Sequence, residues 1–150
     1  MSYDNNNIFA KILRGEIPCK KIYENDHVLA FHDINPQKKI HVLVIPKREY
    51  IDLDDFNNKA SDKEIAEFNK AITHVSNLLG VKDKGYRALT NIGSHGGQEV
   101  PHMHFHIFAG EKVGKKKKKK LSSGKAINKE GLTTFTRQMA TLLNAGLPLL

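Results

Sequence analysis

Residues 96–110 read GGQEVPHMHFHIFAG, and the regular spacing of histidine in this stretch decides how the rest of the chain is interpreted. Histidines alternate with apolar residues, so that His102, His104 and His106 are interleaved with Met103, Phe105 and Ile107. Side chains on a β-strand point alternately to its two faces, and residues two apart therefore share a face. Because a helix cannot produce this period, the pattern predicts a strand over residues 102–109 with one imidazole face and one apolar face.

The spacing alone leaves four interpretations of the imidazole face open. The first is a chance cluster on a solvated strand. The second is a zinc or iron site, in which neutral imidazoles converge on a metal and Glu99 or His41 supplies a further ligand. The third is catalysis at phosphorus, where one imidazole attacks as nucleophile while a neighbour holds its tautomer or protonates the leaving group. The fourth is a nucleotide-binding module without catalysis.

The segment before the histidines favours phosphorus chemistry over metal binding. It reads NIGSHGGQEV and combines the amide of Asn91 with glycines, followed by Gln98 and Glu99. Main-chain N–H groups of such a loop can bind phosphate oxygens, and a metal site has little use for these neutral donors. Taken alone, the glycines are equally explained by a hairpin turn.

The composition is that of a soluble protein with one domain. A chain of 150 residues with 39% hydrophobic and 27% charged residues is long enough to bury one core. No run reaches the roughly 20 apolar residues of a membrane span, and the start MSYDNNNIFAKIL lacks the pattern of a signal peptide. We therefore expect a cytoplasmic protein whose single cysteine, Cys19, forms no internal disulfide.

The net charge of +8 comes entirely from the end of the chain. Residues 1–114 contain 15 Lys and Arg against 15 Asp and Glu, whereas residues 115–150 contain 9 basic residues and 1 acidic residue. The first part is therefore neutral and the second carries the whole excess. Because nucleic-acid binding draws on clustered basic charge, we expect no nucleic-acid partner for the first part.

The first half of the chain predicts a short helix and three strands. The helix lies around residues 8–13 and is ended by Gly15. Two extended runs follow, separated by Asn25 and Asp26, a pair suited to a tight turn. The segment IHVLVIP is apolar on both faces apart from His41, which is typical of a central strand buried on both sides.

The second half begins with the clearest helical pattern, over residues 61–79. Ser61 and Glu64 form a capping box at its start, and Gly80 is a natural stop at its end. The segments GYRALTNI and HMHFHIFA then add two strands. Helices interspersed with hairpin-connected strands predict an α+β fold with a largely antiparallel sheet.

From Lys115 the chain changes character. Residues 115–120 are all lysine, which predicts a solvated linker or basic patch. The end of the chain regains helical periodicity and predicts a short C-terminal helix, whose apolar face needs a partner that the sequence does not identify. We divide the chain into a domain of residues 1–114 and a tail of residues 115–150 that is not an independent domain.

The segment NIGSHGGQEVPHMHFHIFAG resembles the signature of the histidine triad (HIT) superfamily, and its Asn and Gly-Gly-Gln resemble the Hint branch, the purine nucleoside phosphoramidases. The block IFAKILRGEIPCKKIYENDHVLAFHDINPQKKIHVLVIPK is similar to the N-terminal part of that branch, and the resemblance covers residues 8–111. It implies a HIT-like fold, a five-stranded antiparallel sheet with two helices, paired as a homodimer. It also implies hydrolysis of the P–N bond of purine nucleoside 5′-phosphoramidates, and of aminoacyl-adenylates, through a nucleotidyl-histidine intermediate.

The resemblance further implies a role for each site residue. His104 would be the nucleophile, His102 and His41 would orient it, and His106 would donate a hydrogen bond to the phosphate. Asn91 and the backbone around Gln98 and Glu99 would bind the phosphate oxygens of the purine nucleotide or help to protonate the leaving amine. Asp33 would hold the ribose hydroxyls, and the base pocket would be lined by Ile34, Phe31 and Ile12. This scheme needs neither a metal nor another cofactor.

Three features depart from the family pattern. Glu99 stands where many animal members have Ser, and Pro101 replaces a residue that is usually aromatic or bulky. The tail of residues 115–150 resembles instead a fragment of the cytoplasmic portion of inner-membrane platform proteins of type IV pilus and type II secretion systems. We interpret it as the product of a fusion or a joined reading frame, without a function of its own; the alternative is a native tail that recruits anionic partners.

Overall fold

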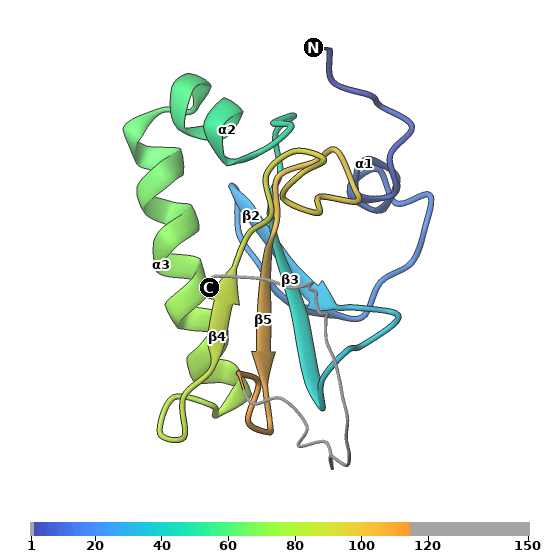
Figure 1. Cartoon of the computed structure of the whole chain (residues 1–150). Coiled ribbons are helices and arrows are strands. Elements are labelled where there is room, and N and C mark those ends of the chain that lie inside the picture. Colours follow the sequence, from blue (N-terminus) through green and yellow to red (C-terminus); the bar gives the residue numbers. More distant parts are fainter. Residues whose placement is uncertain (1, 115–150) are drawn as a thin grey trace. The chain divides into compact units, whose positions relative to one another are not determined.

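The structure, a computed structural model, describes residues 2–114, so the predicted linker and C-terminal helix of residues 115–150 lie outside the described range. The described residues form an α+β arrangement of three helices and five strands (Figure 1). In chain order these are α1 (Ile8–Leu13), β1 (Lys21–Glu24), β2 (Val28–His32), β3 (Ile40–Pro46), α2 (Leu53–Lys59), α3 (Asp62–Leu79), β4 (Arg87–Leu89) and β5 (Phe105–Ala109).

The five strands form one antiparallel sheet in the order β1-β2-β3-β5-β4. The predicted central strand is confirmed, because β3 lies in the middle of the sheet and is buried from His41 to Pro46. The predicted turn between β1 and β2 is also present, where the side-chain oxygen of Asn25 accepts the main-chain N–H groups of His27 and Val28 at 2.8 and 2.9 Å. The fold class expected from the sequence is therefore the one observed.

Helix α3 covers one face of the sheet (Figure 1). It begins with the predicted capping box between Ser61 and Glu64 and ends at Gly80, which adopts the left-handed conformation. Its apolar stripe packs against alternate residues of β2, β3 and β5, in a core made by Phe68, Ile72, Val75, Val28, Ala30, Val42, Val44 and Ile107. Burial of this stripe, rather than helix propensity alone, stabilises the long helix.

Helix α1 lies on the opposite face of the sheet. Asn7 caps it, since its side-chain oxygen accepts the N–H of Ala10 at 2.9 Å. Phe9 then packs on a second, smaller core formed by Leu29, Phe31, Leu43 and Ile45. These residues alternate along β2 and β3 with those of the first core, which is why the two faces of the sheet bury different side chains.

Two elements differ from the sequence-based expectation. Helix α2 was not predicted, because it buries one residue, Phe56, and so shows no apolar stripe; Asp52 caps it instead. The last strand begins at Phe105, three residues later than predicted. The reason is that two main-chain N–H groups donate outside the sheet, His102 to the carbonyl oxygen of Val100 and Met103 to the carbonyl oxygen of Tyr50, each at 2.8 Å. Neither residue therefore joins the sheet.

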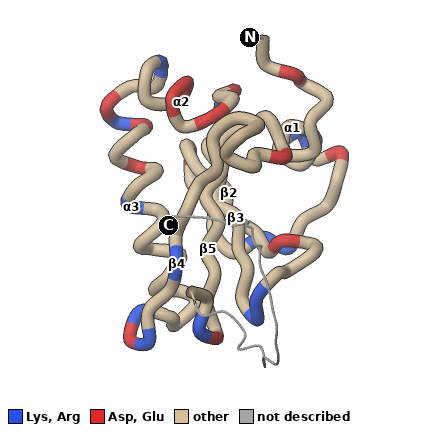
Figure 2. The backbone as a smooth tube through the Cα atoms, in the orientation of Figure 1, with Lys and Arg blue, Asp and Glu red and all other residues tan. Residues whose placement is uncertain are grey.

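Charged residues of both signs are interspersed over residues 2–114, in agreement with the balanced count for this part of the chain (Figure 2). The clearest single-sign group is acidic and marks the start of α2, at Asp52, Asp54 and Asp55. Among the described helices, none combines the length and the hydropathy needed to cross a bilayer.

Candidate active site

Three of the four predicted catalytic histidines lie side by side on the α1 face of the sheet. His41 on β3 and His106 on β5 join their rings through Nε2 and Nδ1, 2.9 Å apart. The ring of His104, just before β5, lies with its centroid 5.0 Å from that of His106. Phe9 of α1 packs its ring against His104 at a centroid distance of 4.9 Å and so covers the cluster from the helix side.

The fourth histidine, His102, is held apart from His41. Its Nε2 lies 2.8 Å from the carbonyl oxygen of Pro46, and its Nδ1 lies 2.5 Å from the hydroxyl of Tyr3. His41 pairs instead with His106. The late start of β5 takes His102 off the strand face that carries His106. His102 contacts His104 through its main-chain carbonyl oxygen, and its expected role in orienting His104 stays a prediction.

The hydrogen bonds assign the proton on His41 and His106. The main-chain N–H of Gln37 donates to Nδ1 of His41 at 3.1 Å, so the ring proton of neutral His41 is on Nε2. This Nε2–H faces Nδ1 of His106 at 2.9 Å and a carboxylate oxygen of Asp33 at 3.3 Å. Since His106 then accepts at Nδ1, its own proton is on Nε2, which leaves His106 as a hydrogen-bond donor.

A second set of bonds assigns His102 and His104. A carbonyl oxygen only accepts, so Nε2 of His102 carries the proton that points to Pro46, and Nδ1 accepts from Tyr3. Nδ1 of His104 lies 2.6 Å from the carbonyl oxygen of His102 and must likewise be a donor. Nε2 of His104 is then left with a lone pair, which is the atom of a neutral imidazole that can attack an electrophile.

Burial keeps these imidazoles neutral. His102 is 0% exposed and His104 is 4% exposed. Desolvation lowers the pKa of His102 to about 4 and lowers the pKa of His104, although Asp33 and Glu99 partly oppose the second effect. The pKa of His106 is also well below its ordinary value, through burial and through the neighbouring His104 and His41. Near pH 7 the cluster therefore offers lone pairs and neutral donors rather than positive charge.

The positions of three potential ligands can be compared with those that a zinc site needs. Asp33, His41 and His106 place one potential ligand atom each within 4.8 Å of one another, a donor set that would suit zinc. Zinc binds a bare imidazole nitrogen, but the Gln37 N–H occupies Nδ1 of His41 and so keeps the proton on Nε2. A metal in this position would have to break that bond, and the observed network fits a proton-holding role better.

The glycine-rich loop before the histidines is braced by Gln98. Its side-chain oxygen accepts from the N–H of Gly93 at 2.9 Å, and its side-chain nitrogen donates to the carbonyl oxygens of Ile51 and Val100 at 2.7 and 3.0 Å. The Gln98 side chain is thus used within the loop, whereas the expected phosphate contact is that of the main chain around Gln98 and Glu99. Asn91 is half-buried and Glu99 is exposed, so both remain accessible to a ligand.

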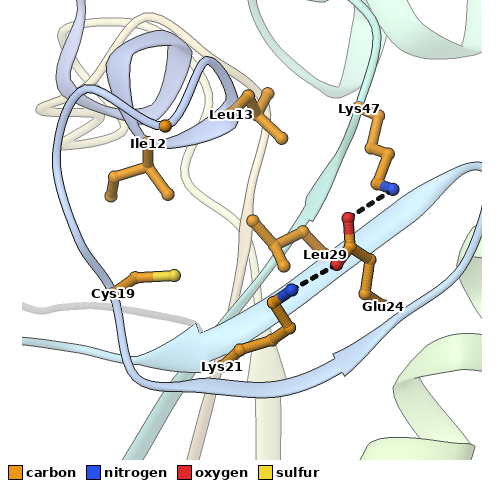
Figure 3. A pocket seen from close by; sticks show the side chains of 8 residues that line it. Ile12, Leu13, Cys19, Lys21, Glu24, Leu29 and Lys47 are labelled. Carbon is orange, nitrogen blue, oxygen red and sulfur yellow. Dashed lines mark hydrogen bonds and ion pairs between the residues drawn. The ribbon is translucent and has the colours of Figure 1, made fainter.

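The three residues expected at the base of a nucleotide lie in different surroundings. Phe31 is buried in the core beneath α1, with its ring 5.7 Å from that of Phe9, whereas Ile34 is 87% exposed. Ile12 lines a cavity of about 470 Å³ beside β1 (Figure 3). Within the single chain, these side chains therefore do not close around one pocket.

The cavity beside β1 is separate from the histidines. None of the four histidines lines it, and Lys21 at its β1 edge lies three strand spacings from His106, roughly 14 Å, by way of Phe31 and Leu43. Leu29, on β2, is the lining residue two strands from β5. Figure 3 shows Glu24 between two lysines, 2.5 Å from Lys21 and 2.6 Å from Lys47. These bonds lower the pKa of Glu24 to about 2 and neutralise much of the lysine charge, so the cavity contains its own counter-ion.

A known protein family matches most of the described residues. The model of the HIT domain family matches residues 14–113. The chain belongs to the HIT family. The match includes the four histidines, and it begins after α1, so Tyr3 and Phe9 lie outside it.

Relatives of this HIT protein occur in several bacteria. A HIT-like protein of 13.2 kDa from Azospirillum brasilense is 55% identical over 113 residues, which are 75% of this chain and 93% of the relative. A purine nucleoside phosphoramidase from Escherichia coli K12 is 39% identical over 110 residues, covering 71% of this chain and 89% of the relative.

Solved structures agree with the HIT fold. A histidine triad protein from Clostridium difficile has a TM-score of 0.67 and 41% identity, covering 77% of this chain and all of its own. A HIT family hydrolase from Clostridium thermocellum has a TM-score of 0.69 and 37% identity, covering 75% and 97% of the two chains. At the level of the family, these relatives indicate a hydrolase.

Sequence reasoning missed several contacts of the HIT site. Tyr3 bonds His102, and the hydroxyl of Thr90 donates to the carbonyl oxygen of His104 at 2.6 Å. The groups that assign the other ring protons belong to the main chain of Gln37 and Pro46, where the residue type carries no signal. Tyr3 could have been noticed only as an aromatic residue before the first helix, and its partner lies 99 residues away.

Proposed function

We propose that this HIT protein hydrolyses the P–N bond of purine nucleoside 5′-phosphoramidates, with aminoacyl-adenylates as a second substrate class. The observation that carries the proposal is the bond from Nδ1 of His104 to the carbonyl oxygen of His102, at 2.6 Å. It leaves Nε2 of a neutral imidazole free to attack phosphorus. The phosphoramidase among the relatives supports the choice of bond.

In the proposed first step, Nε2 of His104 attacks the α-phosphorus, and the bond from phosphorus to the amine nitrogen breaks. The amine leaves with a proton relayed from solvent, for which we assign Glu99 because it is exposed and its charge acts on the pKa of His104. In the second step, water attacks the same phosphorus and the bond from phosphorus to His104 breaks. One proton returns to solvent, and the products are an amine and a nucleoside 5′-monophosphate.

The remaining site residues are proposed to hold the phosphate and the nucleoside. His106 donates from Nε2 to a phosphate oxygen while His41 and Asp33 fix its tautomer, which the bonds of 2.9 and 3.3 Å support. The amide of Asn91 and the main chain around Gln98 and Glu99 supply further donors to the phosphate. Asp33 also contacts the ribose hydroxyls.

We assign the purine base to the three apolar side chains expected to contact it, Ile34, Ile12 and Phe31. Ile34 is the best supported of these, because an apolar side chain that is 87% exposed has most of its surface available to a ligand. Ile12 and Phe31 would support the base from α1 and β2. We further propose a cytoplasmic homodimer, in which two copies pair at the edge strand β4, whose residues Arg87 and Ala88 are exposed.

A steady-state assay with an aminoalkyl adenosine phosphoramidate tests the proposal. We expect His104→Ala to lower kcat by at least about a thousandfold, since removing a covalent nucleophile leaves only binding and positioning. AMP binding, measured by calorimetry, should persist in the variant. The matched control is His74→Ala, which removes an exposed imidazole of α3 on the other face of the sheet.

The alternatives give different results in the same assay. A metal-dependent hydrolase would lose activity on treatment with a chelator, whereas the proposed histidine nucleophile is unaffected. A nucleotide-binding module would bind AMP and release no amine from the substrate. Full activity of His104→Ala would contradict the assignment of the nucleophile.

A further inference from the structure

The N-terminal segment, which precedes the part of the chain matched by the HIT family model, delivers a hydroxyl group to the site. The hydroxyl oxygen of Tyr3 lies 2.5 Å from Nδ1 of His102. The two rings also meet edge to face, with centroids 5.6 Å apart and an interplanar angle of 72°. Tyr3 is therefore fixed against His102 by both a polar and an apolar contact.

The position of Tyr3 follows from the start of α1. Asn7 caps the helix through its side-chain oxygen, and its side-chain nitrogen donates to the carbonyl oxygen of Asp4 at 2.7 Å. Arg14, at the end of the same helix, donates to the carbonyl oxygen of Asn5 at 2.9 Å. These bonds tie the segment before the helix to the helix itself, so Tyr3 is held by more than its own contact with His102.

The bond has one possible direction in the neutral network. Nε2 of His102 must donate to Pro46, so Nδ1 accepts and the Tyr3 hydroxyl donates. Burial raises the pKa of Tyr3, which keeps the hydroxyl protonated near neutral pH. With both ring nitrogens engaged, His102 can neither rotate nor exchange its tautomer without losing a bond.

The constraint on His102 reaches His104 through the main chain. The carbonyl oxygen of His102 accepts the Nδ1–H of His104 at 2.6 Å. Phe9 adds a second link, since its ring meets those of His102 and His104 at centroid distances of 6.2 and 4.9 Å. A change in the ring position of His102 would therefore alter the carbonyl group and the aromatic contact that orient His104.

We propose that Tyr3 is a positioning residue of this HIT enzyme, whose hydroxyl fixes the ring and tautomer of His102 and thereby the orientation of the His104 imidazole. The catalytic part of this inference rests on the proposed role of His104 as nucleophile. The structural part does not, because the tautomer of His102 can be measured without any substrate.

The variant Tyr3→Phe tests the inference, because it keeps the ring contact and removes the hydroxyl alone. Imidazole ¹⁵N NMR spectra of the full chain should show His102 protonated at Nε2 with a hydrogen-bonded Nδ1. In Tyr3→Phe the Nδ1 resonance should move to the position of a nitrogen without a hydrogen bond, or the tautomers should mix. We expect kcat for the phosphoramidate to fall roughly tenfold with an unchanged KM, since a buried acceptor loses its donor.

Tyr23→Phe is the matched control. It removes a tyrosine hydroxyl bonded to Asn25 at 3.1 Å, beside His74 and away from the catalytic cluster, so the His102 resonances and kcat should not change. Unchanged His102 resonances in Tyr3→Phe, or an unchanged kcat, would overturn the inference. An inactive wild-type chain would instead contradict the proposed function, and the NMR comparison would still decide whether Tyr3 fixes His102.

Discussion

The chemistry of the site depends on which nitrogen of each histidine carries the proton. Main-chain groups of Gln37 and Pro46 assign His41 and His102, and the main chain of His102 assigns His104. The sequence could predict the four histidines, because their residue type and spacing are visible in it. It could not predict which nitrogen of each ring carries the proton, since a carbonyl oxygen or an amide N–H looks the same at every position.

The lowered pKa values of the buried histidines predict an unusual acid limit of activity. Burial lowers the pKa of His104 below the ordinary value of 6.5, so the neutral nucleophile persists as the pH falls past that value. We expect the acid-side decline of kcat/KM to be centred below pH 6.5. A decline centred at or above pH 6.5 would contradict this, and His74→Ala should have the wild-type profile.

At the scale of elements, the loop between β4 and β5 leads directly into the histidine segment and contacts residues far away in the sequence. Its glycines and Gln98 could be recognised as a loop next to the histidines whose main chain is expected to bind phosphate, but the sequence assigned no role to the Gln98 side chain. The Gln98 side chain bonds Gly93, Ile51 and Val100, and this requires the segment before α2, which contains Ile51, to approach from 47 residues away. The same long-range approach, through the main chain of Tyr50, delays the start of β5.

The loop geometry predicts the effect of adding one methyl group. A Cβ atom at Gly96 would lie 2.3 Å from the main-chain carbonyl oxygen of Ile92. This oxygen cannot move away without opening the loop. We expect Gly96→Ala to raise KM for the phosphoramidate by about tenfold, because overpacking of this kind displaces the backbone. Kinetics together with a thermal melt will distinguish local from global damage.

Ser94→Ala is the control for that measurement, since Ser94 is exposed in the same loop. Its KM and melting temperature should match those of the wild type. Wild-type kinetics in Gly96→Ala would show that the loop does not determine substrate binding.

At the scale of the whole molecule, the sequence predicted the sheet and the long helix because each has a strong periodic pattern. Helix α3 shows its stripe and capping box, and β3 shows a continuous apolar run. Helix α2 was not predicted because Phe56 is its one buried residue, with Leu53 only partly buried, so the helix shows no apolar stripe. The pairing of β3 with β5, on which the meeting of His41 and His106 depends, joins segments 65 residues apart and has no local signal.

The division into a domain and a tail predicts that the chain can be shortened. Residues 1–114 carry balanced charge, and the HIT family match ends at residue 113. We expect a chain truncated after Gly114 to keep the melting temperature, the kcat and the proposed dimeric state, measured by sedimentation, of the full chain. Aggregation, or loss of the dimer, would show that residues 115–150 belong to the folded unit.

The most direct test of the account is detection of the covalent intermediate. The enzyme is mixed with excess adenosine phosphoramidate, quenched with alkali within milliseconds and digested, and the peptide that contains His104 is examined by mass spectrometry. The account predicts an AMP adduct on the imidazole of His104, which decays as AMP is released and is absent from His104→Ala. Turnover without an adduct, or an adduct on another residue, would contradict it.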